Sequence, residues 1–284
     1  MKQTARQARD AGRILGFVPT MGALHAGHLA LVEKARRESS PVVVSIFVNP
    51  KQFGPREDYQ KYPRTLEADG RMLEAAGVDV LFVPSVEEMY PPGFRTEVGV
   101  EGLGERLEGR VRPGHFRGVT TVVLKLLEIV SPQLAYFGRK DAQQARIIRQ
   151  MVADLALDCE VVVCPIVREA DGLAMSSRNA YLSPSERRAA TVLFRALDRA
   201  RQAVAAGERD AGRLGSLMRA VLAEEPLAAP DYVELVNADS LEPVARLDGA
   251  CLALLAVRLG ATRLIDNMLV EPGDVGGPGM VCSL

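Results

Sequence analysis

The first 166 residues alternate between short, mostly apolar runs and apolar positions spaced three or four residues apart. Such runs are typical of strands buried on both faces of a parallel sheet, whereas the spaced pattern indicates helices with one buried side. The runs predict strands at 14–18, 41–48, 78–83, 134–137 and 160–164. The spaced positions predict helices at 28–35, 64–76, 118–130 and 141–155. This alternation predicts a doubly wound α/β fold, a Rossmann-like parallel sheet with helices on both faces.

The pattern changes after about residue 166. Ser183 and Glu186 have the spacing of a capping box, with Pro184 at the first helical position, so one long helix is predicted from there to about residue 206. The remaining predictions are a helix at 211–223 and strands at 231–236, 251–257 and 263–269. Helices and strands in this order predict a smaller α+β domain, 167–284, after a larger domain of residues 1–166. Residues 84–113, rich in Gly, Pro and charge, are predicted to be irregular.

Composition and charge restrict the class of protein. The net charge is −1 and there is no Trp, so neither a basic nucleic-acid-binding face nor a base-stacking platform is indicated. The apolar runs are far shorter than the ~20 residues of a membrane span, and the first residues lack the apolar core of a secretory signal. The cysteines show no Cys-x-x-Cys spacing and are interpreted as reduced thiols: Cys159, Cys164, Cys251 and Cys282. We therefore expect a cytoplasmic protein with no nucleic-acid or membrane partner.

The turn after the first predicted strand carries the strongest chemical signal. His25 and His28 lie between that strand and the next helix, close to Gly22 and Gly27, which let the backbone approach a ligand closely. A helix N-terminus offers unpaired N–H donors and a positive dipole end, and a neutral imidazole can donate to a phosphate oxygen. The turn therefore predicts a phosphate site, although it is neither a P-loop nor a three-glycine dinucleotide sequence. Half of a metal site and ordinary loop histidines are the alternatives.

Polar residues also follow other predicted strands, at the edge of a parallel sheet where ligands usually bind. Asn49 and Gln52 follow the second strand, and residues 138–141 follow the fourth. Within the latter, Lys140 can neutralise phosphate charge, and Gln144 would share its helix face one turn later. Between the predicted domains, the small hydroxyls and the arginine of residues 175–178 suit a movable phosphate clamp. A solvated lysine, surface amides and a polar linker are the competing interpretations.

Several of these segments resemble, in the same order, the motifs of one enzyme superfamily. His25-Ala26-Gly27-His28 is similar to the His-x-Gly-His signature of the adenylylating superfamily that holds class I aminoacyl-tRNA synthetases and nucleotidylyltransferases. Residues 175–178, Met-Ser-Ser-Arg, resemble its Lys-Met-Ser-Lys-Ser-type motif. The stretches at 45–53, 62–64, 115–119 and 167–172 narrow the resemblance to the pantothenate synthetase family. It runs from about residue 14 to residue 267 and departs from the family pattern at Arg139, where the family usually has Glu.

The resemblance implies an ATP-dependent ligase. Such an enzyme joins the carboxylate of pantoate to the α-phosphorus of ATP and releases pyrophosphate. It then transfers the pantoyl group to the amine of β-alanine and releases AMP. The resemblance also implies Mg²⁺ carried with the phosphates, no protein metal site, and a cytoplasmic homodimer whose C-terminal domain acts as a lid.

The resemblance further implies a set of site residues. ATP would be bound by Met21, Gly22, Ala23, Leu24, His25, Ala26, Gly27, His28, Gly138, Arg139, Lys140, Asp141, Val167, Met175, Ser176, Ser177 and Arg178. The catalytic groups among them would be His28, His25, Lys140, Ser176, Ser177 and Arg178. Gln52 and Gln144 would hold pantoate, and Gln52 also β-alanine.

Two other functions stay open for the sequence. One is a different nucleotidyl-transferring enzyme on the same fold, which a pantoate-dependent release of pyrophosphate would exclude. The other is a non-catalytic nucleotide-binding protein, which AMP release would exclude. A tRNA partner is disfavoured by the net charge and by the lack of room for an anticodon-reading domain.

Overall fold

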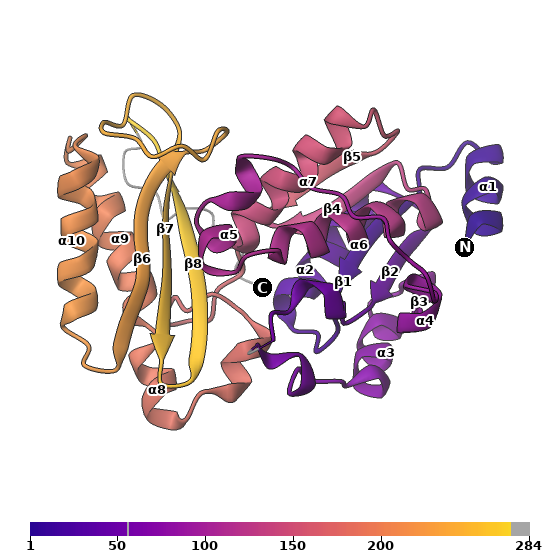
Figure 1. Cartoon of the computed structure of the whole chain (residues 1–284), viewed down its shortest axis with the longest axis horizontal. Coiled ribbons are helices and arrows are strands. Elements are labelled where there is room, and N and C mark those ends of the chain that lie inside the picture. The colour runs from indigo at the N-terminus through magenta and orange to yellow at the C-terminus, as the bar shows by residue number, and fades with distance from the viewer. Residues whose placement is uncertain (56, 274–284) are drawn as a thin grey trace. The chain divides into compact units, whose positions relative to one another are not determined.

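The computed structural model describes residues 1–55 and 57–273. The chain divides into two compact units, Met1–Cys164 and Pro165–Leu284, called here the first and the second unit (Figure 1). The cysteines in the described ranges, Cys159, Cys164 and Cys251, form no disulfide, and Cys282 lies outside those ranges. None of the described helices is both long and apolar enough to cross a membrane.

The first unit is built on a five-stranded sheet in the order β3-β2-β1-β4-β5, with every pair parallel. Its strands are β1 (Gly16–Thr20), β2 (Val42–Ile46), β3 (Val80–Phe82), β4 (Leu134–Gly138) and β5 (Glu160–Cys164). Gly16 pairs with Val42 of β2 on one side and with Leu134 of β4 on the other, so β1 lies at the centre. The predicted doubly wound parallel sheet is confirmed, and its order is the one common to nucleotide-binding α/β folds.

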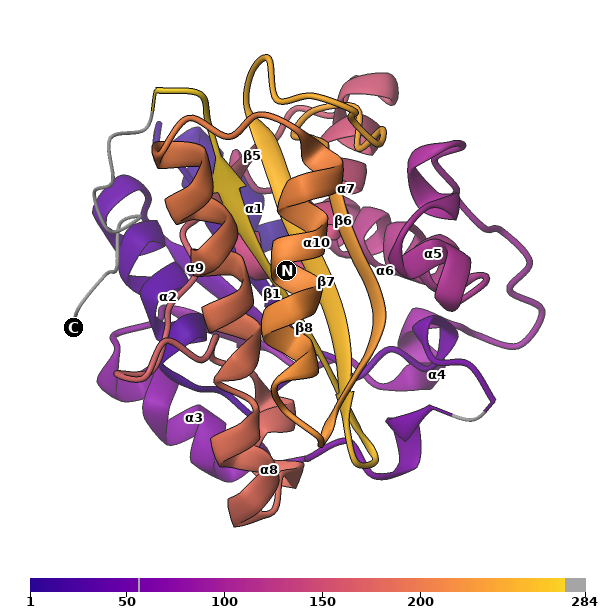
Figure 2. The same cartoon turned by 90° about the vertical axis from the view of Figure 1, so that its left-hand side faces the viewer.

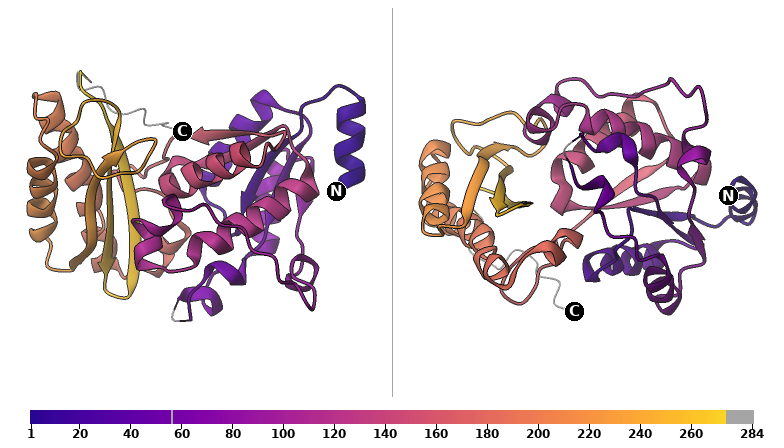
Figure 3. Two further views of the ribbon diagram at one scale, coloured as in Figure 1. Left: turned by 45° about the horizontal axis from the view of Figure 1, so that its top comes forward. Right: turned by 60° about the horizontal axis from the view of Figure 1, so that its bottom comes forward.

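Helices cover both faces of this sheet (Figure 3). Phe17 and Val43 pack into one core with α6 and α7, whereas Val18 and Val44 pack into another with α2 and α3. The α-helices of this unit are α1 (Lys2–Asp10), α2 (Ala26–Glu38), α3 (Leu66–Ala75), α4 (Val86–Met89), α5 (Glu108–Val111), α6 (His115–Val130) and α7 (Ala142–Asp154). The 3₁₀ turns are η1 (Pro50–Gln52), η2 (Asp58–Gln60), η3 (Leu103–Glu105) and η4 (Arg139–Asp141). Burial on both faces explains why the inner strands β2 and β4 are nearly continuous apolar runs, whereas the edge strand β3 is partly exposed.

The first unit differs from the prediction in two segments. The polar start of the chain forms α1, which was not predicted, because among the side chains described for this helix the buried ones are the small Ala5 and Ala8, which give a weak apolar signal. The segment 84–113, predicted to be irregular, contains the short helices α4 and α5. Ser85 and Glu88 form a capping box at the start of α4, a signal that the sequence does contain.

The second unit holds a three-stranded antiparallel sheet in the order β6-β7-β8. Its elements are η5 (Ser177–Tyr181), α8 (Pro184–Ala189), α9 (Val192–Ala205), α10 (Ala211–Ala223), β6 (Ala228–Asn237), β7 (Cys251–Leu259) and β8 (Thr262–Val270). Helices α9 and α10 lie side by side on one face of this sheet (Figure 2). Apolar residues of both helices and of the strands form one core. The predicted smaller α+β domain is confirmed.

The single long helix predicted after Ser183 is instead two helices, α8 and α9. The predicted capping box is present, since the Ser183 hydroxyl accepts from the Glu186 N–H and the Glu186 carboxylate accepts from the Ser183 N–H. Between the two helices the Thr191 hydroxyl donates to the Arg188 carbonyl oxygen at 2.9 Å, a side-chain bond that competes with helical backbone bonding.

Candidate active site

The two histidines of the first turn stabilise the start of α2. His25 is the N-cap residue, and its Nδ1 accepts from the Gly27 N–H at 3.2 Å. The His25 N–H in turn donates to His28 Nδ1 at 3.3 Å, and the two ring centroids are 4.1 Å apart. Because each Nδ1 is an acceptor, the proton of each neutral ring lies on Nε2. Nε2–H is therefore the donor group of each imidazole.

The environment of His28 keeps it neutral. Burial, followed by electrostatic interactions with His25 and then Lys140, lowers the pKa of His28 to about 3. Lys140 therefore lies close enough to His28 for its charge to act there. A neutral donor next to a fixed cation suits the oxygens of a phosphate group.

A buried carboxylate that lies outside every predicted motif holds the turn before the histidines. Asp69 on α3 is 2% exposed and accepts from the Ala23 N–H and the Leu24 N–H, both at 2.9 Å. The Thr65 hydroxyl also donates to it at 3.1 Å. Gly22 and Ala23 both have positive φ, of 80° and 50°, so the turn has an uncommon backbone conformation. Asp69 therefore fixes residues 21–24, which were predicted to bind ATP.

Gln52 is held at the end of η1 through its side chain and its backbone. The Asn49 amide, 1% exposed, donates to Gln52 Oε1 at 3.0 Å and to the Gly118 carbonyl at 3.1 Å. The Tyr90 hydroxyl donates to Asn49 Oδ1 at 2.8 Å and so fixes the Asn49 amide. Gln52 Nε2 then points to Met21 Sδ at 3.1 Å, which brings Gln52 next to the turn after β1.

A third histidine, His115 at the start of α6, holds the backbone of Gln52. Its Nδ1 lies 2.8 Å from the Gln52 carbonyl oxygen and its Nε2 lies 3.1 Å from an Arg112 nitrogen. A carbonyl only accepts and a guanidinium only donates, so Nδ1 carries the proton. Burial, followed by the Arg112 charge, lowers the pKa of His115 to about 4. Arg112 also forms an ion pair with Glu57, with contacts of 2.7 and 2.6 Å.

The remaining predicted residues of the first unit follow β4. Gly138 ends this strand, and the turn Arg139–Asp141 connects it to α7. Gln144 lies in the first turn of α7 and is half-buried. Because β2, β1 and β4 are neighbours in a parallel sheet, their carboxyl ends share one edge. The histidines, Gln52 and residues 138–141 all follow that edge.

The other predicted ATP-binding residues belong to the second unit. Val167 is buried, and its carbonyl oxygen accepts from the Met175 N–H at 3.0 Å. Ser176 caps η5, and its hydroxyl accepts from the Arg178 N–H at 3.3 Å. Val167 and residues 175–178 are therefore neighbours across one loop.

Within the described ranges, no group of three or more His, Cys, Asp or Glu side chains is placed to hold a metal ion. The Nδ1 atoms of His25 and His28 already accept from backbone N–H groups. The hydrogen-bonding chemistry of the turn after β1 is thus that of donors for an anion.

The fold and the site define a class of protein. It is a doubly wound α/β protein with two histidines at the N-terminus of its first crossover helix, on the carboxyl edge of the sheet. The chain belongs to the pantoate-beta-alanine ligase family, whose sequence profile matches residues 1–269.

Individual relatives agree over nearly the whole chain. A pantothenate synthetase from Heliobacterium modesticaldum is 61% identical over 265 residues, 93% of this chain and 94% of that protein. The crystal structure of pantothenate synthetase from Thermus thermophilus matches with a TM-score of 0.90 and 51% identity, over 94% of this chain and 98% of that one. A Francisella tularensis pantoate-beta-alanine ligase, crystallised with beta-gamma ATP and beta-alanine, matches with a TM-score of 0.77 and 37% identity. The match covers 94% of this chain and 95% of that one.

Proposed function

We propose that this protein condenses pantoate with β-alanine, with ATP as the activating substrate and AMP and pyrophosphate as products. The observation that carries the proposal is the match of residues 1–269 to the pantoate-beta-alanine ligase family. A carboxylate does not react with an amine until one of its oxygens becomes part of a good leaving group. Adenylation of pantoate supplies that leaving group, and a phosphate-binding turn is the part of the fold that adenylation needs.

In this proposal the turn after β1 and the turn after β4 bind ATP. His28 and His25 donate Nε2–H bonds to phosphate oxygens, a role that their acceptor Nδ1 atoms support. Lys140 neutralises the charge that develops as pyrophosphate leaves, and its influence on the pKa of His28 supports its nearness to that histidine. The other residues proposed to bind ATP in this unit are Met21, Gly22, Ala23, Leu24, Ala26, Gly27, Gly138, Arg139 and Asp141.

Gln52 and Gln144 are proposed to bind pantoate, and Gln52 also β-alanine. An amide both donates and accepts, which suits a substrate that carries hydroxyls and a carboxylate. The fixed orientation of the Gln52 amide supports this role, because an ordered side chain loses little entropy on binding.

From the second unit, Val167 and Met175 through Arg178 are proposed to bind ATP. The Ser176 and Ser177 hydroxyls and the Arg178 guanidinium are donors of the kind that a triphosphate takes. The contact between Val167 and Met175 supports a single ATP-binding loop in this unit.

We further propose Mg²⁺, a homodimer and a cytoplasmic location. Magnesium usually binds one or two carboxylates together with substrate phosphates, so a chain whose described residues form no metal cluster fits an ion that arrives on ATP. The ion would neutralise phosphate charge. The edge strand β3 exposes Leu81, and Val83 follows it, which gives a second copy an apolar surface to pack on. Thiols outside disulfides, at Cys159, Cys164 and Cys251, suit the cytoplasm.

The test of the activity measures AMP with ATP, pantoate and β-alanine, each omitted in turn. Labelled pyrophosphate should exchange into ATP with Mg²⁺ and pantoate and without β-alanine, because the adenylate forms before the amine is needed. Exchange that requires β-alanine, or ADP as the product, would overturn the mechanism. AMP formation without any dependence on pantoate would indicate a different nucleotidyl-transferring enzyme.

A further inference from the structure

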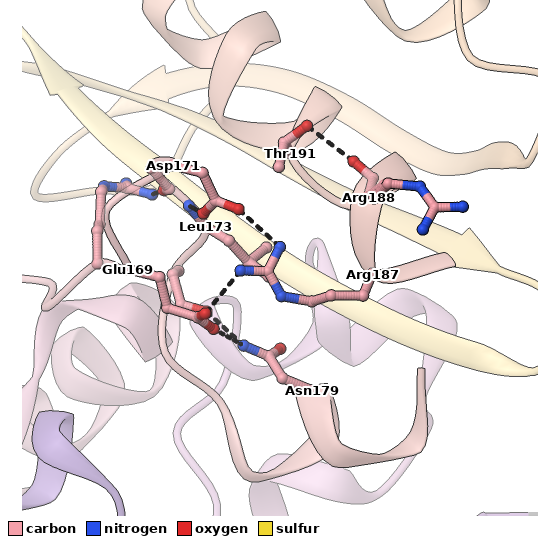
Figure 4. Close-up of polar contacts among 10 residues, drawn as sticks. Glu169, Asp171, Leu173, Asn179, Arg187, Arg188 and Thr191 are labelled. Carbon is pink, nitrogen blue, oxygen red and sulfur yellow. Dashed lines mark hydrogen bonds and ion pairs between the residues drawn. The ribbon is translucent and has the colours of Figure 1, made fainter. Parts of the chain in front are cut away.

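An ionic network holds the loop of the second unit that contains residues 175–178 (Figure 4). Arg187 on α8 donates to Glu169 Oε2 at 2.6 Å and to Asp171 Oδ2 at 2.8 Å. The Asn179 amide donates to Glu169 Oε1 at 3.1 Å and to the Ala174 carbonyl oxygen at 3.2 Å. These four side chains, Glu169, Asp171, Asn179 and Arg187, are called here the latch.

The latch differs from the other ion pair that anchors this loop. Arg168 donates to both carboxylate oxygens of Asp266 on β8, at 2.7 and 3.0 Å, and to the Gly172 carbonyl oxygen at 3.0 Å. The Arg168 and Asp266 side chains are 8% and 1% exposed, whereas those of Arg187 and Glu169 are 29% and 31% exposed. One anchor is buried against the sheet, and the other is accessible to water and salt.

We propose that Arg187 and Glu169 are positioning residues that set the geometry of Ser176 through Arg178 for ATP. They act through Asn179, the residue after Arg178, which joins Glu169 to the Ala174 backbone. The inference rests on the proposed function in one respect, that residues 176–178 contact ATP.

The geometry of the two carboxylates in the latch favours an arginine over a lysine at position 187. One planar guanidinium reaches two carboxylates through two different nitrogens, which a lysine ammonium does not do in the same geometry. Hydrogen bonding to Arg187 lowers the pKa of Asp171, so the pair is charged at pH 7. Without Arg187, two carboxylates would stand unneutralised next to a loop that is to bind a polyanion.

The neighbouring arginine provides a matched control. Arg188 is exposed, lies on the same helix and points away from Glu169 and Asp171 (Figure 4). Among the described residues it has no ion-pair partner. Arg187→Gln and Arg188→Gln therefore remove the same charge from α8, but only the first removes the latch.

The first measurement is hydrogen exchange of the ATP-free protein. Arg187→Gln should increase exchange of the backbone amides at 174–182, whereas Arg188→Gln should match the wild type. This experiment does not depend on catalysis. Unchanged exchange in Arg187→Gln would overturn the proposal whether or not the protein forms AMP.

The second measurement is the kinetics of AMP formation. Arg187→Gln should raise KM for ATP by about tenfold or more, with KM for β-alanine unchanged, and Arg187→Lys should recover part of the loss. Glu169→Gln should raise KM for ATP to a similar extent. The double variant, Arg187→Gln with Glu169→Gln, should lose less free energy of ATP binding than the sum of the losses in the two single variants. Equal increases in every KM, or equal effects of Arg187→Gln and Arg188→Gln, would contradict a positioning role. A wild type that forms no AMP would refute the proposed function, and the exchange result would still decide the latch.

If Arg187→Gln fails to fold, Arg187→Lys and Glu169→Gln test the same contacts. Thermal unfolding of each variant separates a loss of stability from a change in ATP binding. A variant that unfolds like the wild type and still binds ATP normally would contradict the proposal.

Discussion

At the scale of residues, the turn after β1 presents histidine donors held by backbone contacts. A histidine whose pKa is about 3 carries no charge at pH 7, so His28 is not poised as a general acid or base near neutrality. Its Nδ1 is occupied by the His25 N–H, which leaves the Nε2–H as its donor. Its proposed role is therefore hydrogen bonding to phosphate oxygens in the transition state.

We predict that His28→Ala lowers kcat for AMP formation by ~10²–10³-fold, the usual cost of losing one transition-state donor. His28→Gln should retain more activity, because an amide N–H can replace part of the donation. Circular dichroism should show both variants folded. AMP release at a normal rate by folded His28→Ala would refute the role.

We also predict that Asp69→Asn raises KM for ATP and lowers the free energy of unfolding by ~1–3 kcal/mol. An asparagine keeps one acceptor oxygen but turns an NH₂ group toward the Ala23 or Leu24 N–H, so a buried donor loses its partner. Glu67→Gln on the same helix is the control, since the Glu67 side chain is 87% exposed. Denaturant titration and ATP kinetics measure both effects. Similar results for the two variants would show that Asp69 does not hold the turn.

At the scale of elements, α6 is fitted closely against η1. A Cβ added at Gly118 would lie 2.3 Å from the Lys51 carbonyl oxygen and 2.8 Å from the Gln52 nitrogen. The glycine thus allows the α6 backbone to approach the turn that carries Gln52. The Gly118 carbonyl also accepts from the Asn49 amide, which donates to Gln52 as well, so one helix position supports both the backbone and the side chain of Gln52 in the proposed pantoate site.

Gly118→Ala should therefore lower the free energy of unfolding by ~1–3 kcal/mol, the usual cost of overpacking, and raise KM for pantoate. Gly70→Ala in α3 is the matched control, because nothing lies within 4 Å of a Cβ there. In that open position alanine should stabilise the helix by ~0.5–1 kcal/mol. Denaturant unfolding and pantoate kinetics of both variants provide the comparison. A Gly118→Ala enzyme with normal KM for pantoate would mean that η1 adjusts without moving Gln52.

At the scale of the whole molecule, two histidines connect the stability of the fold to pH. Burial lowers the pKa of His28 to about 3 and that of His115 to about 4, against 6.5 in the unfolded chain. Below pH 6.5 the unfolded state therefore binds protons that the folded state does not. The free energy of unfolding should fall as the pH falls from 6.5 toward 4.

Each histidine should change the free energy of unfolding by at most ~1.4 kcal/mol per pH unit. Denaturant unfolding of the ATP-free protein at pH 7, 6 and 5 measures this slope. His28→Gln and His115→Gln should each remove one histidine's share of the slope, and stability between pH 8 and 7 should be unchanged. A wild type equally stable at pH 7 and pH 5 would contradict this account.

The sequence by itself determined the elements and the order in which they occur. Runs such as 41–48 are apolar at every position except Ser45 because both faces of their strand are buried, and this needs only local information to predict. The capping box at Ser183 and the placement of His25 and His28 at the start of α2 are local for the same reason. The family motifs around these positions were also readable, although the roles of the site residues stay a prediction.

Only the tertiary structure decided which side chains hold the site in place. Asp69 accepts from N–H groups 45 and 46 residues away, and His115 contacts a carbonyl oxygen 63 residues away. No spacing rule predicts such pairs, because they depend on the order in which β1, β2 and β4 lie in the sheet. His115 was visible as one of three histidines, but nothing local distinguishes Asp69 from an ordinary helix carboxylate. A buried carboxylate or imidazole must find a partner, and the partner is chosen by the packing of distant elements.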